Sequence, residues 1–224
     1  MRKQSLIFIL LSVAFFYYTS AQVFVMDLPP GNIKVVSSEK EKGLDGTPWL
    51  TDSWIPGTVV LASGKKVEGL KYRYNVYRNL LYFQYENAEY VISSHDSIDH
   101  LIMGDELYRY GNSDPAKKDN VRLLLIAEEG KADLYINYYP VIIPANYNIA
   151  LGSGNPNETV AVKESYLIKV GNELTLIDKK GKLIPVALAD KKTEISEFIK
   201  KEKISAKNRA DLIKVVRYYN SLKD

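Results

Sequence analysis

The densest group of potential metal ligands in this chain lies between residues 95 and 106. It combines two imidazoles with four carboxylates: His95, Asp96, Asp99, His100, Asp105 and Glu106. Imidazoles and carboxylates together bind zinc and other divalent metals. His95 and His100, however, are five positions apart and face opposite sides of a strand, whereas a zinc-binding helix places two histidines four positions apart on one face. We therefore predict a polar bend with surface histidines, no metal site and no cofactor.

Hydrolytic chemistry has equally little support. Ser94, His95 and Asp96 are the residue types of a serine-hydrolase triad, but consecutive side chains in an extended chain point apart, and a triad is assembled in space. Gly152-Ser153-Gly154 lacks the Gly-x-Ser-x-Gly spacing of a nucleophile elbow. The sequence therefore predicts a protein that is not an enzyme, and a hydrolase using His95 or His100 is the weakest alternative.

Tyrosine is the distinctive residue type, since 15 of the 17 tyrosines follow residue 21. Exposed aromatic rings bind glycans and partner proteins, because each ring offers apolar area together with a polar group. Aromatic residues also suit half-buried strands, and for any single tyrosine that structural role is favoured. The candidate binding residues are the aromatic side chains at the start of the expected sheet: Trp49, Trp54, Tyr72, Tyr74 and Tyr77.

Short apolar segments that alternate with turn signals predict a β-meander from Trp49 onward. Expected turns lie at residues 62–65, 78–79, 129–131, 171–172 and 180–181. Residues 121–127 are apolar on both faces apart from Arg122, which predicts a central strand. Pro140 and Pro144 are expected to interrupt strand pairing, with residues 146–157 as a polar connection.

The hydrophobic period changes near Ala189. Apolar residues then recur three and four positions apart, as in Ile195, Phe198 and Ile199, which is typical of an amphipathic helix. We expect two helices, at about 190–203 and 206–222, with Asp190 and Ser205 as N-caps. The predicted fold class is α+β: a mainly antiparallel sheet, as a meander or as two packed sheets, with two C-terminal helices packed on it.

The first 21 residues have the layout of a secretory signal peptide. Arg2 and Lys3 precede an apolar run at residues 6–16, which is shorter than the ~20 residues that a membrane-spanning helix needs, and Thr19-Ser20-Ala21 supplies small residues for cleavage. We expect export to the periplasm or outer surface, with no transmembrane span after removal of residues 1–21. Residues 22–48 are predicted to be a flexible leader and residues 49–224 a single domain.

Composition excludes further classes. Without residues 1–21 the chain has 28 basic and 27 acidic residues, a balance that does not suit binding to nucleic acid. The absence of cysteine excludes disulfides, so stability must come from an ordinary core, for which about two hundred residues suffice. Cysteine-free export fits a bacterial envelope.

Several segments together resemble a group of secreted envelope proteins of Bacteroidetes-type bacteria. They include Gly46-Thr47-Pro48-Trp49-Leu50, residues 56–61, residues 64–77, residues 195–203, Asp211-Leu212-Ile213 and Tyr218-Tyr219-Asn220. The resemblance implies export and an order of strands followed by helices, and it supplies no catalytic residues. We therefore expect a non-enzymatic binding or interaction module whose partner is an envelope protein or a glycan. The alternatives are a carrier of an apolar ligand between the sheet and the helices, or the hydrolase described above.

Overall fold

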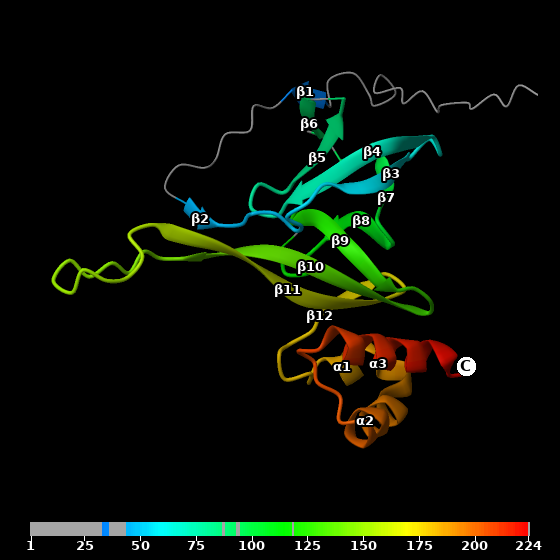
Figure 1. Ribbon diagram of the computed structural model, residues 1–224. Coiled ribbons are helices and arrows are strands. Elements are labelled where there is room, and N and C mark those ends of the chain that lie inside the picture. The colour runs from blue at the N-terminus through cyan, green and yellow to red at the C-terminus, as the bar shows by residue number, and fades with distance from the viewer. Residues whose placement is uncertain (1–32, 36–43, 87, 93–94, 118, 224) are drawn as a thin grey trace, which may run out of the picture.

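The computed structural model describes residues 33–35, 44–86, 88–92, 95–117 and 119–223, so the predicted signal peptide lies outside the described residues. Twelve strands of these described residues form one strongly curved sheet, with the C-terminal helices below it (Figure 1). The strands are β1 (Ile33–Val35), β2 (Leu44–Gly46), β3 (Ile55–Leu61), β4 (Lys66–Asn75), β5 (Leu80–Tyr85), β6 (Ala88–Ile92), β7 (Ile98–Met103), β8 (Glu106–Asn112), β9 (Val121–Glu128), β10 (Ala132–Ile143), β11 (Glu158–Val170) and β12 (Glu173–Leu176). The helical segments are α1 (Ile184–Ala187), the 3-10 helix η2 (Ala189–Lys191), α2 (Lys192–Lys201) and α3 (Arg209–Ser221). The predicted α+β class is confirmed.

Most of the sheet is an antiparallel meander. The strand order is β1-β6-β5-β4-β3-β7-β8-β9-β10-β11-β12. The turn between β3 and β4 falls at residues 62–65 as predicted, with Gly64 at a φ of +82°. The turn between β4 and β5 is longer than the predicted two residues: it spans residues 76–79, because the Asn75 side chain accepts a hydrogen bond from the Arg78 amide and ends the strand early.

The predicted central strand is confirmed as β9, which lies between β8 and β10. Pro140, in contrast, does not interrupt β10, which runs through it to Ile143 and pairs with β11. The last β9–β10 pair is Leu124↔Asn137, so at Pro140 the strand β10 is paired with β11 and no longer with β9. The N–H that proline lacks would point to the edge that β9 has left, and its absence therefore removes no hydrogen bond between strands. The Tyr138 carbonyl, just past that last pair, accepts a hydrogen bond from Arg122 Nε instead.

Two strands lie within the segment that the sequence predicts to be a flexible leader. Ile33–Val35 pairs with β6, and Leu44–Gly46 pairs parallel with Glu158–Val160 of β11. Paired structure therefore begins before Trp49, and the boundary at residue 49 is too late. The reason is that each strand is only three residues long, too short for hydrophobic alternation to show.

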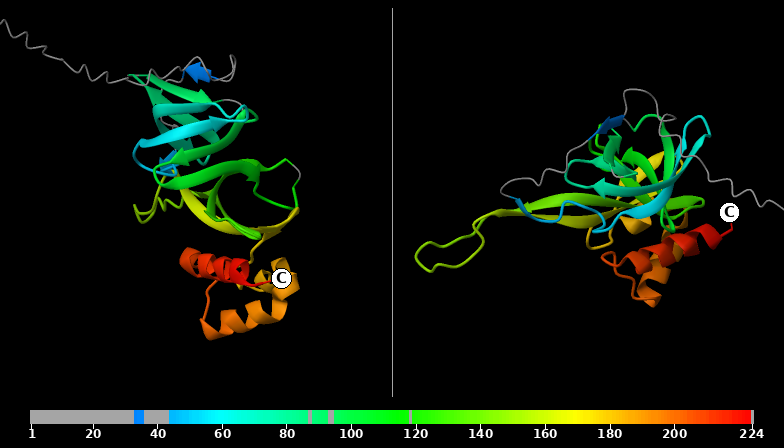
Figure 2. Two further views of the ribbon diagram at one scale, coloured as in Figure 1. Left: turned by 90° about the vertical axis from the view of Figure 1, so that its right-hand side faces the viewer. Right: turned by 45° about the horizontal axis from the view of Figure 1, so that its top comes forward.

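The larger of the two buried clusters of the described residues includes side chains of the sheet and of the helices. Leu134 and Ile136 of β10 belong to the same buried cluster as Leu212 and Val216 of α3. α3 packs against β9 and β10, and α1 packs against β11 and β12. Burying an apolar helix stripe in this way stabilises a helix that would be marginal alone. The helices and the sheet thus share one core. Figure 2 shows the arrangement of the helices and the sheet from two further directions.

The helix boundaries differ from those predicted. Lys180-Gly181 is not a hairpin turn but leads into the short α1, and the two longer helices begin two to three residues later than expected. Asn208, not Ser205, caps α3 by accepting from the Asp211 amide, and Asp190 accepts from the Tyr219 hydroxyl instead of capping α2. In the described part of the chain, no helix combines the length and apolarity needed to cross a membrane.

The most prominent feature of the outline is an arm formed by the far ends of β10 and β11. Figures 1 and 2 show this two-stranded ribbon extending well beyond the body of the sheet. Its register is continuous from Ala132↔Val170 at the base to Ile143↔Thr159 near the tip. We refer to residues 144–157, which connect the two strands, as the arm tip.

Candidate ligand groove

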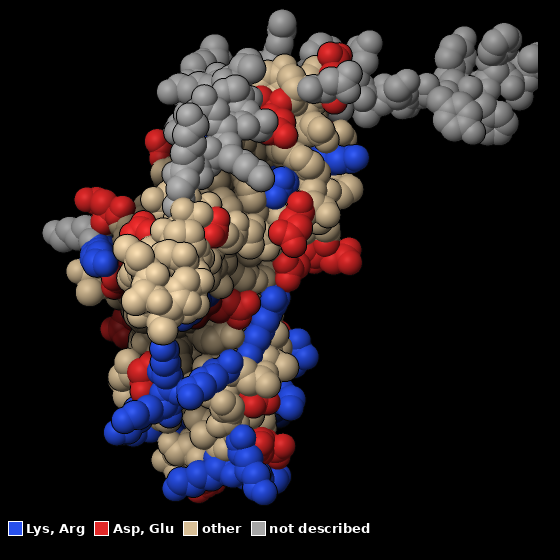
Figure 3. Space-filling view, turned by 60° about the vertical axis from the view of Figure 1, so that its left-hand side comes forward, with Lys and Arg blue, Asp and Glu red and all other residues tan. Residues whose placement is uncertain are grey.

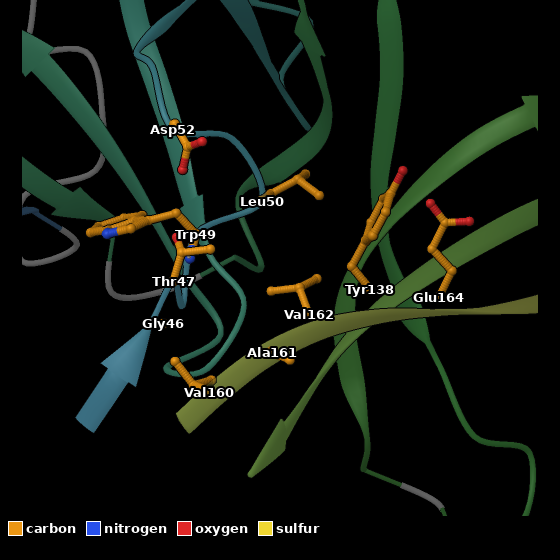
Figure 4. Close-up of a pocket in the computed structure, with 10 residues that line it drawn as sticks. All are labelled: Gly46, Thr47, Trp49, Leu50, Asp52, Tyr138, Val160, Ala161, Val162 and Glu164. Carbon is orange, nitrogen blue, oxygen red and sulfur yellow. The ribbon is translucent and has the colours of Figure 1, made fainter. Parts of the chain in front are cut away.

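An open groove of about 470 Å³ lies between the segment that follows β2 and the adjoining parts of β10 and β11 (Figure 4). Ten described residues line it: Gly46, Thr47, Trp49, Leu50 and Asp52 on one side, and Tyr138, Val160, Ala161, Val162 and Glu164 on the other. Leu50 and Val162 lie in the middle, with Trp49 to one side and Tyr138 and Glu164 to the other. These lining residues include two carboxylates, Asp52 and Glu164, and no basic side chain.

Gly46 fixes where the groove begins. Its φ of +83° is the left-handed conformation that favours glycine, and a Cβ there would lie 2.2 Å from the Val160 carbonyl oxygen. The chain turns away from β11 at this point and joins β4 instead: the Leu50 amide donates to the Tyr74 carbonyl and the Val76 amide to the Pro48 carbonyl. This change of partner separates residues 47–50 from β11 and forms one wall of the groove.

The departure of the chain leaves part of the β11 edge open. β2 pairs with residues 158–160 and β12 with residues 167–170, so between them residues 161–166 have β10 as their described strand partner. Residues 171–172 form the turn between β11 and β12, and the residues that flank it, Val170 and Glu173, are its closing hydrogen-bonded pair. Backbone groups alternate along a strand, and those of Val162 and Glu164 therefore point toward the open edge. The Tyr166 carbonyl follows the same alternation and accepts from the Ile177 amide.

One end of the groove is stiffened by aromatic and cationic packing around Trp49. The Arg73 guanidinium carbon lies 4.2 Å from the Trp49 ring centroid and 5.7 Å from that of Trp54. Arg73 Nε also donates to the Thr51 carbonyl, and the Trp49 ring meets Tyr82 edge-on with 5.0 Å between centroids. These contacts hold the Trp49 side chain in one orientation beside the groove.

The other end adjoins a network of hydroxyl, carboxylate and guanidinium groups. The Tyr166 hydroxyl donates to Glu164 at 2.9 Å, and Arg209 at the start of α3 is ion-paired with Glu106 at 2.9 Å. Burial, reinforced by the negative charge of Glu164, raises the pKa of Tyr138 to about 12. Burial and the hydrogen bond to Glu164 raise the pKa of Tyr166 to about 12. Both phenols therefore remain protonated donors at neutral pH.

The structure separates the aromatic candidates that the sequence groups together. Trp49 lines the groove, and Trp54 adjoins it through Arg73. Tyr72 and Tyr74 are buried core residues with 1% and 0% exposure, so they have no surface to offer a ligand. Their alternation along β4 directs both rings to the inner face of the sheet. Tyr77 is exposed in the turn between β4 and β5 and is not among the lining residues.

The histidines lie elsewhere. The His95 ring lies 4.8 Å from that of Tyr110, and His100 Nδ1 lies 2.7 Å from a carboxylate oxygen of its neighbour Asp99. Neither histidine lines the groove, and Ser94 lies outside the described residues. Among the described residues, no three His, Asp or Glu side chains converge as metal ligands.

Sequence reasoning missed Val162, Glu164 and Tyr138 as groove residues. They come together with residues 46–52 through a pairing between segments more than a hundred residues apart. The sequence holds no local signal for this pairing, because β2, with three residues, is too short for hydrophobic alternation to show.

Comparison with known proteins gave no match: not to any protein-family model, to any curated protein sequence or to any solved structure.

Proposed function

We propose that this protein is an exported, non-enzymatic binding module of the bacterial envelope that binds an extended polypeptide segment in the groove. The observation that carries the proposal is the open edge of β11 at residues 161–165, which borders the groove. An added strand would accept hydrogen bonds from, and donate them to, the outward backbone groups of Val162 and Glu164. Export is supported by the pattern of residues 1–21 and by the resemblance to secreted envelope proteins.

The chemistry of the walls indicates which segment fits. Leu50, Val162 and the Trp49 ring offer apolar surface for alternate side chains of an added strand. Asp52 and Glu164 are exposed carboxylates of the lining, and the arginines that interact with them electrostatically, Arg73 and Arg209, lie outside it. A segment in which apolar residues alternate with Lys or Arg therefore complements the groove in both shape and charge. A glycan would use the aromatic ring and the carboxylates but would leave the backbone edge unused.

The interior of the domain gives less support to a carrier of apolar ligands. The side chains between α3 and the sheet belong to one buried cluster, in which Leu134, Ile136 and Val216 are each 0% exposed. We therefore place the ligand in the surface groove and not between the helices and the sheet.

The test uses the chain beginning at Gln22, which retains every described residue, and a displayed library of linear peptides. Selected peptides are expected to alternate basic and apolar residues and to lose affinity when alternate backbone amides are methylated. Val162→Pro removes the outward N–H from an edge position where proline is tolerated and should weaken binding about tenfold, while Val162→Thr should not.

Charge selection is tested separately with Glu164→Gln and Asp52→Asn. Both should reduce the preference for Lys and Arg without changing the thermal unfolding of the chain. Peptides that bind equally well to Val162→Pro, or glycans that bind while the selected peptides do not, would remove the basis for strand addition.

A further inference from the structure

The arm tip carries a second surface with a different chemistry. Residues 134–157 contain no Asp, Glu, Lys, Arg or His, although a quarter of the whole chain is charged. Ile149 and Leu151 at the tip are 89% and 74% exposed. Ile142, Ile143 and Tyr147 are also exposed large apolar residues on or next to the tip. Single exposed apolar residues are common, but five within ten positions and with no charge among them mark a docking surface.

Many polar groups of the tip are hydrogen-bonded within it. The Asn148 side-chain oxygen accepts from the amides of Ala150 and Leu151, and that of Asn146 accepts from the Asn155 amide. Backbone pairs join Asn148 with Ser153 in both directions. In all, eight backbone N–H groups donate to acceptors within the tip: those of residues 146, 148, 150, 151, 152, 153, 155 and 157. Most of the backbone amides of the tip are thus bonded internally, which lowers the cost of taking this loop out of water.

We propose that the arm tip docks the protein on a lipid surface, with Ile149 and Leu151 entering the apolar side of the membrane–water interface. Three observations favour lipid over a protein pocket: the long uncharged stretch, the internally bonded amides, and Tyr147, a residue type enriched at that interface. The insertion is shallow, and the backbone of the tip stays a closed turn.

The shape of the molecule allows this docking. The arm extends away from the body, so the tip reaches a flat surface before the body of the sheet does (Figure 1). Figure 3, which brings the arm side forward, shows an uncharged projection with Lys and Arg side chains gathered on the helical part below it. Those cations would add attraction to anionic lipids, and the tip would supply binding that does not depend on charge.

The test is co-sedimentation of the chain beginning at Gln22, which lacks the apolar segment at residues 6–16 that would itself bind lipid. The probes are phosphatidylcholine vesicles, with and without phosphatidylglycerol. The parent should bind neutral vesicles and keep that binding at high salt. Ile149→Asp/Leu151→Asp should reduce the partition coefficient about tenfold or more, because two carboxylates replace the inserted side chains.

The matched control is Ala62→Asp/Ser63→Asp, which adds the same charge in the exposed turn between β3 and β4, on the opposite side of the molecule from the arm (Figure 1). It should bind like the parent, and both double variants should unfold at the parent temperature. Ile149→Trp should show a blue-shifted emission with neutral vesicles and quenching by brominated lipid, which reports insertion directly.

Three outcomes would overturn the proposal. One is equal vesicle binding by the parent and the arm-tip variant. Another is binding confined to anionic vesicles and lost at high salt. The third is absence of lipid binding together with a concentration-dependent dimer that Ile149→Asp/Leu151→Asp dissociates, which would assign the tip to a second copy of the chain. The lipid assay uses no peptide, so vesicle binding can be absent while peptide binding in the groove is observed. Peptide binding can likewise be absent while vesicle binding is observed.

Discussion

Asn220 of α3 and Ala132 at the start of β10 are joined by two reciprocal hydrogen bonds. The Ala132 amide donates to the Asn220 side-chain oxygen at 2.8 Å, and Asn220 Nδ2 donates to the Ala132 carbonyl at 3.0 Å. Ala132 has 0% exposure. The asparagine thus acts as a strand neighbour for one residue of β10 and anchors the end of α3 to the sheet.

We expect Asn220→Ala to lower the free energy of unfolding by about 1–3 kcal/mol, because it leaves a buried amide and carbonyl without partners. Gly130→Ala should act on the same contact, since a Cβ at Gly130 would lie 2.4 Å from Asn220 Nδ2. Chemical denaturation measures both. Additive losses in the double variant would show that the two positions do not share one contact.

Val216→Asp places a carboxylate at a position with 0% exposure between α3 and the sheet. The expected loss is about 3–5 kcal/mol, seen as a lower melting temperature for the whole domain. Lys214→Asp, two residues away on the exposed face, should cost less than about 1 kcal/mol, because it replaces a surface pair with Asp211 by a repulsion that solvent screens. If Val216→Asp melted with the parent, the helices would be an appendage and not part of the core.

Replacing both His95 and His100 with Asn should leave the free energy of unfolding within about 1 kcal/mol of the parent, because both rings are partly exposed and their contacts are few: His95 with Tyr110 and Asp96, and His100 with Asp99. Peptide affinity and vesicle binding should also be unchanged, since neither ring lines the groove or lies on the arm. Stoichiometric metal in the purified protein that disappears in the double variant would show that the histidines do bind a metal.

The raised pKa values of Tyr138 and Tyr166 predict that the free energy of unfolding falls at alkaline pH. Each has a folded-state pKa of about 12, above its ordinary value of 10.0, so the folded chain holds the phenolic proton more tightly than the unfolded chain. Their contribution is complete below pH 10 and is lost as the pH rises toward 12. Glu164→Gln should lower both pKa values, measured by ultraviolet titration of tyrosinate. Glu173→Gln, on β12, is the control and should leave them unchanged.

Protein isolated from its native host should begin at Gln22, because Thr19-Ser20-Ala21 supplies the small residues that signal peptidase requires. N-terminal mass spectrometry checks this, and conversion of Gln22 to pyroglutamate is compatible with it. An intact Met1 would contradict the predicted export.

Features set by neighbours in the sequence were predictable. The turn at Gly64, the central strand β9 and the stripe of Leu212, Val215 and Val216 in α3 all follow from local period and turn chemistry. The prediction that Pro140 interrupts strand pairing is wrong. Proline breaks a hydrogen bond between strands only where its nitrogen faces a paired strand, and Pro140 lies beyond the last residue of β10 that pairs with β9. The local sequence does not reveal where that pairing ends.

The groove was less predictable than the fold. Trp49 was identified by residue type, but Glu164 and Val162 become groove residues only because the chain leaves β11 at Gly46. Burial separates Tyr72 and Tyr74 from Tyr77 although all three look alike in sequence. The arm tip had a visible signal in its uncharged stretch, whereas the exposure of Ile149 depends on the projection of the arm beyond the body.

The parallel pairing of β2 with β11 has a consequence for how the chain folds. Leu44 pairs with Glu158, a closure over more than a hundred residues, whereas most neighbouring strands of the meander close over short turns and β3 and β7 over about forty residues. Loop closure of this length is slow and entropically costly, so β2 should reach its place after the meander has formed. During synthesis the groove wall must wait for β11 to emerge. The groove is therefore completed only after the meander, and a ligand bound there would slow the reopening of this late-formed contact.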